Sequence, residues 1–244
     1  PLVITLLFAS HPIHTEAVSW ISGRFYVIQT VFYLSSFICY VKARYSMRWF
    51  MLSLGFLVVC LMLGSNVVSL PIMFLAYELL FPDISKSNPR YRRFRIFIVS
   101  LILLIGFVVS LMYFVQRFKY SHTIYTFRGW SYLIAVAKAF LYYLKILYLP
   151  LQRGIFHSFA YVNPKLNQAS PLFYFSHAVI AAMVTSLFAL RKKLMAVSFG
   201  IMWFLVAFAP YSNIVPICNI ISERYLYLPS IGYSIVVAAL FLKA

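Results

Sequence analysis

The stretch HPIHTEAVSWISGR, residues 11–24, is a polar island between two apolar segments, residues 2–10 and 25–40. It contains two histidines, one carboxylate and one guanidinium. Holding such groups beside hydrocarbon costs a few kcal/mol each, so we expect them to be paired or to serve a function. A solvated loop that starts a helix is the alternative interpretation. A second island of the same kind, residues 212–229, lies near the other end of the chain.

The composition is that of an integral membrane protein. Of the 244 residues, 64% are hydrophobic and only 10% are charged, whereas soluble domains carry roughly 25% charged residues. The net charge of +17 would suggest nucleic acid on a soluble chain. Here the basic residues stand in short runs between apolar segments, which indicates membrane topology and contact with anionic lipid headgroups. We therefore predict membrane lipids, and not nucleic acid, as the partners of these basic runs.

Apolar runs predict the helices and their number. A helix that spans a membrane needs about 20 apolar residues, and the runs fall at 1–10, 25–41, 49–63, 67–82, 96–115, 130–150, 171–190, 194–210 and 226–243. The basic groups between them belong on the cytoplasmic side by the positive-inside rule. That rule places both polar islands on the opposite side of the membrane.

The run 130–150 breaks this alternation, because a full crossing there would place Arg191, Lys192 and Lys193 outside. Lys138 and Lys145 are seven positions apart and share one helix face. We therefore predict an amphipathic helix in the outer interface. The predicted fold is all-α, with about eight transmembrane helices plus one interfacial helix. Residues 1–244 would form a single polytopic membrane domain, a fragment that is incomplete at its N-terminus.

Three interpretations of the first island remain open. His11, His14 and Glu16 offer two nitrogens and one oxygen, a set that suits a divalent metal. Glu16 could instead act as a base on an acceptor hydroxyl, alone or by orienting His14. In the third interpretation, the same residues form a structural knot in which Thr15 and Glu16 cap helix ends.

The two arginines that flank the islands, Arg24 and Arg224, are candidates for binding a phosphate. A guanidinium can donate two parallel hydrogen bonds to phosphate oxygens. A phosphate that is still attached to its lipid would meet these side chains at headgroup depth. The alternative is that both side chains only extend to the membrane interface.

Three segments resemble a known family in sequence and in order. Residues 11–24 resemble the H-P-x-H-T-E-A-V-x-x-x-x-G-R stretch of the multi-spanning O-mannosyltransferases that carry tetratricopeptide repeats, and of their bacterial relatives. Residues 199–232 resemble the family's F-G-x-x-W-F, P-x-S-N and E-R-Y-L-Y-L-P-S-x-G signature, and residues 70–81 give a third match. The resemblance implies a GT-C-type membrane glycosyltransferase. Such an enzyme takes its sugar from a polyprenyl-phosphate carrier on the lumenal or extracytoplasmic face.

The resemblance implies roles for the residues singled out above. Arg24 and Arg224 would bind the lipid phosphate, Glu16 and His14 would be catalytic, and the supporting residues would be His11, Glu223 and Tyr225. The acceptor would be a protein or a glycan. The membrane would be the endoplasmic reticulum or a bacterial inner membrane.

The chain also departs from the family pattern. Phe25 and Tyr26 follow Arg24 where the family usually has an acid, and residues 64–66 read Gly-Ser-Asn where it usually has Ser-Lys-Glu. The family's catalytic aspartate would precede Pro1, and the repeats would follow Ala244. These departures leave a rival hypothesis open, in which an inactive relative acts as a structural subunit with membrane-protein partners.

Overall fold

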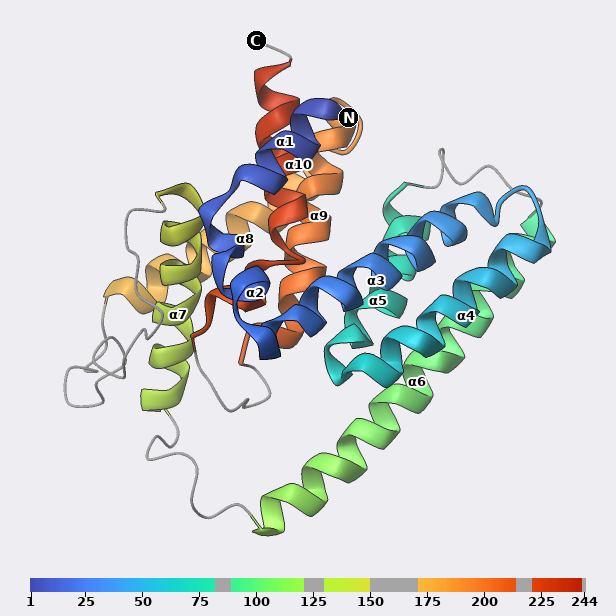
Figure 1. Ribbon diagram of the computed structural model, residues 1–244, viewed down its shortest axis with the longest axis horizontal. Coiled ribbons are helices and arrows are strands. Elements are labelled where there is room, and N and C mark those ends of the chain that lie inside the picture. The colour runs from blue at the N-terminus through green and yellow to red at the C-terminus, as the bar shows by residue number, and fades with distance from the viewer. Residues whose placement is uncertain (82–88, 121–129, 150–170, 214–220, 243–244) are drawn as a thin grey trace. The chain divides into compact units, whose positions relative to one another are not determined.

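The computed structural model describes residues 1–81, 89–120, 130–149, 171–213 and 221–242, and contains no strand among them (Figure 1). The α-helices are α1 (Leu2–Ser10), α2 (Thr15–Ser19), α3 (Arg24–Lys42), α4 (Met47–Leu63), α5 (Ser69–Leu80), α6 (Pro89–Tyr120), α7 (Trp130–Tyr148), α8 (Pro171–Leu190), α9 (Met195–Phe208) and α10 (Ser230–Phe241). Short 3-10 helices are η1 (Pro12–His14), η2 (Ile21–Gly23), η3 (Ser65–Val68), η6 (Ala209–Tyr211) and η7 (Glu223–Leu226). The predicted all-α class is confirmed.

Each apolar run of the sequence corresponds to one α-helix, but α6 is longer at both ends than its run 96–115, and α10 begins four residues after the start of its run 226–243. Helix α6 begins at Pro89, so the bases Arg92 and Arg95 lie inside the helix rather than in a loop before it. The reason is tertiary, because both side chains form ion pairs with Glu78 of α5. Residues 150–170, between the runs 130–150 and 171–190, lie outside the described part of the chain.

Two of the described helical segments are long and apolar enough to cross a membrane. They are Ile21–Lys42, with 22 residues, and Phe173–Leu190, with 18. Four further apolar helices are shorter, namely Met47–Leu63, Ser69–Leu80, Met195–Tyr211 and Ser230–Phe241. The predicted eight crossings are therefore not confirmed by helix length and composition.

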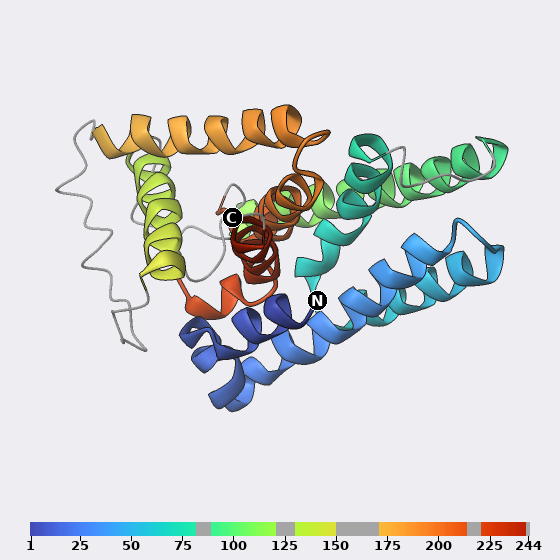
Figure 2. The same ribbon diagram turned by 90° about the horizontal axis from the view of Figure 1, so that it is seen from above.

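The chain divides into two compact units. Unit 1 contains Pro1–Arg24 and Thr123–Ala244, and unit 2 contains Phe25–His122. Within unit 1, α10 packs against α9 and α1, and α8 packs against α9 and α7. Figure 2 shows α7 meeting α8 near the N-terminal end of α8. The single membrane domain inferred from sequence stays a prediction.

Helices α9 and α10 approach each other through two glycines. A Cβ on Gly200 would lie 2.7 Å from the carbonyl oxygen of Gly232, and a Cβ on Gly232 would lie 2.7 Å from the backbone nitrogen of Phe204. Any side chain at either position would therefore push the helices apart. The Trp203 indole adds a hydrogen bond of 3.1 Å to the carbonyl oxygen of Leu228. This pairing fixes the start of α10, directly after the second polar island.

Unit 2 contains a buried ionic cluster. The carboxylate of Glu78 is fully buried and lies 2.7 Å from Arg95 Nη2 and 3.1 Å from Arg92 Nε. Arg95 also donates to the carbonyl oxygen of Tyr40 at the end of α3, at 3.4 Å. The cluster joins α3, α5 and α6.

Candidate functional site

The first island folds into a compact turn that presents Glu16. Helix α2 is only five residues long, and η2 returns the chain across it to the start of α3. A Cβ on Gly23 would lie 2.9 Å from the carbonyl oxygen of Glu16, so the close return of the chain requires glycine at this position. The Thr15 hydroxyl donates to the carbonyl oxygen of Pro12 at 2.7 Å and closes the first turn. The contacts that shape the turn around Glu16 are therefore local in sequence.

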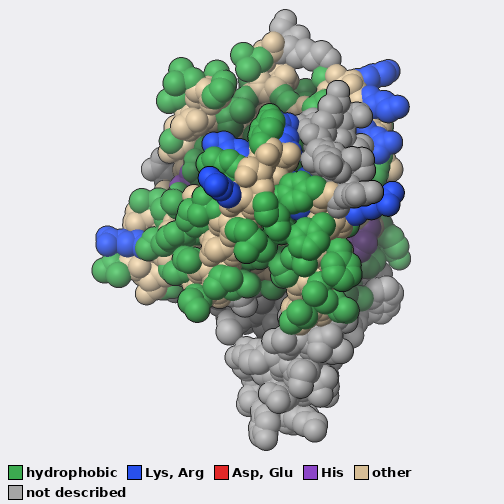
Figure 3. Space-filling view, turned by 90° about the vertical axis from the view of Figure 1, so that its right-hand side faces the viewer, with side chains coloured by type: hydrophobic (Ala, Val, Ile, Leu, Met, Phe, Trp, Pro, Cys, Tyr) green, Lys and Arg blue, Asp and Glu red, His purple; other side chains and the backbone are tan. Residues whose placement is uncertain are grey.

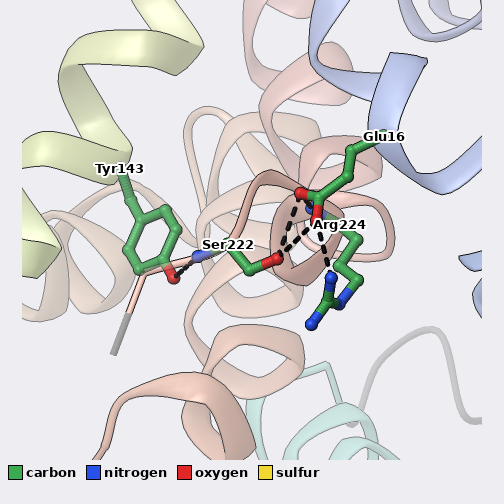
Figure 4. A network of polar contacts seen from close by, with 4 residues as sticks. All are labelled: Glu16, Tyr143, Ser222 and Arg224. Carbon is green, nitrogen blue, oxygen red and sulfur yellow. Dashed lines mark hydrogen bonds and ion pairs between the residues drawn. The ribbon is translucent and has the colours of Figure 1, made fainter. Parts of the chain in front are cut away.

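The carboxylate of Glu16 reaches the second island, as Figure 4 shows. Its Oε1 accepts a hydrogen bond of 2.6 Å from Arg224 Nη1, and its Oε2 accepts one of 2.9 Å from the Arg224 backbone N–H. The Ser222 hydroxyl lies 2.8 Å from Oε1 and 3.0 Å from Oε2. A single carboxylate thus engages the backbone and side chains of a segment more than 200 positions away in sequence.

The ion pair between Arg224 and Glu16 is largely, but not fully, buried. The side chain of Arg224 is 12% exposed and that of Glu16 is 13% exposed. The Arg224 guanidinium also stacks over two aromatic rings, 4.7 Å from the centroid of Trp20 and 5.4 Å from that of Tyr225. Partial burial strengthens the charge interaction relative to water. The guanidinium is consequently held in one orientation by a carboxylate and two ring faces.

Tyr143 of α7 completes the network, because its hydroxyl oxygen accepts a hydrogen bond of 2.9 Å from the Ser222 backbone N–H (Figure 4). Tyr225 in turn stacks on Tyr211, with ring centroids 4.8 Å apart. Sequence reasoning missed Ser222, Tyr143 and Trp20 as members of the site. Ser222 and Trp20 lie inside the two islands, so their position in the sequence could have indicated them. No local pattern distinguishes Tyr143 from the other tyrosines of its helix.

The two histidines face aromatic rings rather than the carboxylate. The His14 ring lies 4.4 Å from the ring of Phe8 and 4.8 Å from that of Tyr227, between centroids. Burial is the main reason why the pKa of His14 falls to about 4, and the neighbouring His11 adds to that shift. The Phe8 carbonyl acts in the opposite direction but does not offset burial. His14 is therefore neutral at pH 7.

His11 anchors the first island to α7. Its Nε2 lies 2.9 Å from the carbonyl oxygen of Leu147, and its ring meets that of Tyr233 edge-on at 5.8 Å. Neither ring nitrogen of His14 has a geometrically formed hydrogen bond within the described residues. Both histidines consequently join the packing between the island and its neighbours.

The structure does not assemble the predicted metal ligands. Nowhere in the described residues do three His, Cys, Asp or Glu side chains gather as a metal site would require. The physical reason is that Glu16 is engaged by Ser222 and Arg224, while His14 is packed among rings. His11, His14 and Glu16 therefore do not form the three-ligand set that their spacing suggested. The geometry fits the structural-knot interpretation of this island.

The remaining predicted site residues fall in two groups. Glu223 and Tyr225 lie in η7 beside Arg224, and Tyr225 contacts its guanidinium. Arg24 is exposed at the start of α3 and makes no hydrogen bond or ion pair within the described residues. Arg224 itself forms its ion pair with Glu16 of the first island.

Comparison with known proteins places these segments in context. The chain is 25% identical to a protein O-mannosyl-transferase of Caenorhabditis elegans over 249 residues, which cover 98% of this chain and 34% of that protein. It is 50% identical over 68 residues to protein O-mannosyl-transferase tmtc2 of Xenopus laevis, covering 25% of this chain and 8% of that protein. It is 60% identical over 37 residues to protein O-mannosyl-transferase TMTC2 of Homo sapiens, covering 15% of this chain and 4% of that protein.

The chain thus spans about a third or less of the length of these relatives. No family model matches it, and no solved structure matches it. The similarity to the nematode protein nevertheless runs along almost the whole chain, through both islands. The resemblance inferred from the motifs is confirmed: this chain is a sequence relative of the proteins named protein O-mannosyl-transferases.

Proposed function

We propose that this chain is the membrane part of a glycosyltransferase that moves a sugar from a polyprenyl-phosphate carrier to a protein hydroxyl. The names of its relatives support sugar transfer to protein, with mannose as the sugar. The observation that carries the proposal is the Arg224 guanidinium, which Glu16 holds where the two family-like islands meet. A polyprenyl phosphate is the anion that a membrane-embedded guanidinium at headgroup depth would bind.

The reaction would proceed by direct displacement at the anomeric carbon. The acceptor hydroxyl oxygen forms the new bond to that carbon while the bond from the carbon to the carrier phosphate oxygen breaks. The phosphate leaves with the bonding electrons, and a base takes the hydroxyl proton. Arg224 would stabilise the negative charge that develops on the leaving phosphate. Such a displacement inverts the configuration of the sugar.

Glu16 suits positioning better than proton abstraction. Both of its oxygens already accept hydrogen bonds, from Ser222 and from the side chain and backbone of Arg224. With both oxygens occupied by donors of the second island, the carboxylate is held in place against Arg224. We therefore assign Glu16 to orienting Arg224 and place the base outside this network.

The membrane location is also part of the proposal. Helix α8 exposes large apolar side chains along its length, including Tyr174, Phe175 and Phe188, and only 11% of the stretch Phe173–Leu190 is buried. Such a surface suits lipid and not water. We propose about eight crossings, with α7 as the interfacial helix. Both islands would then face the endoplasmic reticulum lumen or the extracytoplasmic side of a bacterial inner membrane.

Single cysteines test this topology. Ser22 and Lys192 are both exposed and lie on opposite sides in the proposed arrangement. In a background in which Cys39, Cys60 and Cys218 are replaced by alanine, an impermeant thiol reagent should label Ser22→Cys and Lys192→Cys from opposite sides of sealed vesicles. Labelling of both from the same side would contradict the proposed topology.

The phosphate role of Arg224 is tested by carrier binding. Losing a charge-assisted hydrogen bond costs about 1.5–3 kcal/mol, so Arg224→Ala should weaken binding of a polyprenyl phosphate roughly ten- to a hundredfold. Arg224→Lys should recover only part of the loss, because an ammonium lacks the planar fork of the guanidinium. Arg191→Ala, in the exposed turn after α8, is the matched control and should bind as the original chain does.

The same variants decide between the enzyme and the inactive structural subunit. Titration with a polyprenyl phosphate and the yield of folded protein in detergent are measured side by side. Unchanged carrier binding together with a large loss of folded protein would make Arg224 purely structural and would reject the phosphate role. Arg24→Ala, measured in the same way, tests whether the exposed arginine of the first island contributes to binding.

A further inference from the structure

Four helix ends meet at one end of unit 2. The ring of Tyr40, near the end of α3, stacks on Phe74 of α5 at 4.1 Å and lies 6.2 Å from Phe50 of α4, between centroids. Phe50 in turn lies 6.5 Å from Phe94 of α6. Arg95 of α6 adds a further link between these helices, through its ion pair with Glu78 of α5. The residues at the end of α3 and at the start of α4 and α6 therefore lie at the same end of unit 2.

This end is strongly basic. The described side chains here with positive charge are Lys42, Arg44, Arg48, Arg92, Arg93 and Arg95. Glu78 is the sole acid among the described residues of unit 2, and its charge is satisfied internally by Arg92 and Arg95. Lys42, Arg48 and Arg93 are exposed. These three side chains therefore present a positive charge that Glu78 does not balance.

Aromatic and apolar side chains are interleaved with these bases. The Lys42 ammonium lies 4.8 Å from the ring centroid of Trp49, and the Arg44 guanidinium lies 4.5 Å from that of Tyr45. Tyr45 is 74% exposed, and Phe97 of α6 is 63% exposed. Figure 3 shows such a mixture on the face drawn, with Lys and Arg side chains in blue beside a broad hydrophobic surface. Amphipathic aromatic rings next to bases are typical of the headgroup layer of a bilayer.

A buried donor lies at the same end. The Tyr77 side chain is 4% exposed, and its hydroxyl has no hydrogen-bond partner within the described residues. The Arg44 side chain, in the turn after α3, lies in the electrostatic neighbourhood of that hydroxyl. A buried hydroxyl without a partner is uncommon in folded proteins. A phosphate oxygen that reached Arg44 would supply the acceptor that Tyr77 lacks.

We propose that this end of unit 2, formed by Lys42, Arg44, Arg48, Arg93 and Tyr77, binds the headgroup of an anionic phospholipid. The bases recognise the phosphodiester, and the exposed rings beside them contact the upper acyl chains. A free phosphate would satisfy the charges but leave the apolar flank uncovered, so the occupant is a lipid. The proposal rests on the membrane location proposed above and not on sugar transfer.

Lipid retention tests the proposal directly. The purified chain in an uncharged detergent is incubated with phosphatidylglycerol or with phosphatidylcholine of equal chain length, and bound lipid is counted by native mass spectrometry. Each base near an anionic surface contributes roughly a fivefold gain in affinity. The triple variant Lys42→Gln, Arg48→Gln, Arg93→Gln should therefore lose about a hundredfold in phosphatidylglycerol affinity. It removes only exposed side chains and keeps the pair between Arg95 and Glu78.

A second triple variant is the matched control. Arg191→Gln, Lys192→Gln, Lys193→Gln removes the same charge from an exposed turn of unit 1 and should lose clearly less phosphatidylglycerol affinity than the first triple variant. A charge-conserving variant, Lys42→Arg, Arg48→Lys, Arg93→Lys, should retain the lipid. Equal losses in both neutralised variants would show diffuse charge attraction and overturn the proposed site. Competition by soluble glycerol phosphate at the same concentration as the lipid would also overturn it, and neither result bears on carrier binding at Arg224.

Discussion

Replacing Glu16 with alanine is expected to lower the free energy of unfolding by about 3–5 kcal/mol. The substitution leaves the Arg224 guanidinium, whose side chain is 12% exposed, without its carboxylate. It also removes the acceptor of the Ser222 hydroxyl and of the Arg224 backbone N–H. An uncompensated charge in a partly buried position is the largest of these losses. The second island would consequently lose its attachment to the first.

Unfolding in mixed micelles, titrated with a denaturing detergent, measures the effect. A double-mutant cycle with Glu16→Ala and Arg224→Met isolates the interaction energy between the two side chains. We expect a coupling energy of roughly 1–3 kcal/mol. Glu223→Ala is the matched control, because Glu223 is the acid adjacent to Arg224 in sequence. If Glu223→Ala destabilised the chain as much as Glu16→Ala and coupled equally to Arg224, the pairing described here would be wrong.

A second large effect is expected in unit 2, where Glu78→Ala should destabilise the fold by about 3–5 kcal/mol. Glu78 is fully buried, and Arg95 is only 1% exposed, so the substitution leaves a buried guanidinium whose ion pair is lost. Arg92→Gln should cost much less, because the side chain of Arg92 is 32% exposed and water can replace its partner. The contrast between the two variants follows from burial alone.

The decisive control replaces the ion pair by apolar side chains of similar size. Glu78→Leu combined with Arg95→Met should recover most of the stability lost in Glu78→Ala, because the double variant leaves neither member of the pair charged. Both variants are measured by thermal unfolding in detergent, at the same protein concentration. A double variant as unstable as Glu78→Ala would show that the hydrogen bond from Arg95 to Tyr40, and not the ion pair, holds α6 in place.

The position of each long helix along this chain follows from its sequence. Uninterrupted apolar runs bounded by polar residues predict a helix wherever backbone groups must be satisfied internally, and α3, α4 and α8 lie where their runs predicted. The turn at Gly23 is also local, because only glycine permits the return of the chain across α2. The resemblance to the O-mannosyl-transferases likewise followed from linear motifs, and the comparison along 98% of the chain confirmed it.

Tertiary structure alone decided which charged groups became partners. Glu223 is adjacent to Arg224 in sequence, yet Glu16, 208 positions earlier, takes the guanidinium. Side-chain pairing depends on which helix ends meet, and no periodic pattern encodes that choice. Burial, likewise a tertiary property, keeps His14 neutral and separates it from the carboxylate with which its spacing had grouped it. The sequence thus located the two islands, and packing between distant helices determined that they form one network through Glu16, Ser222 and Arg224.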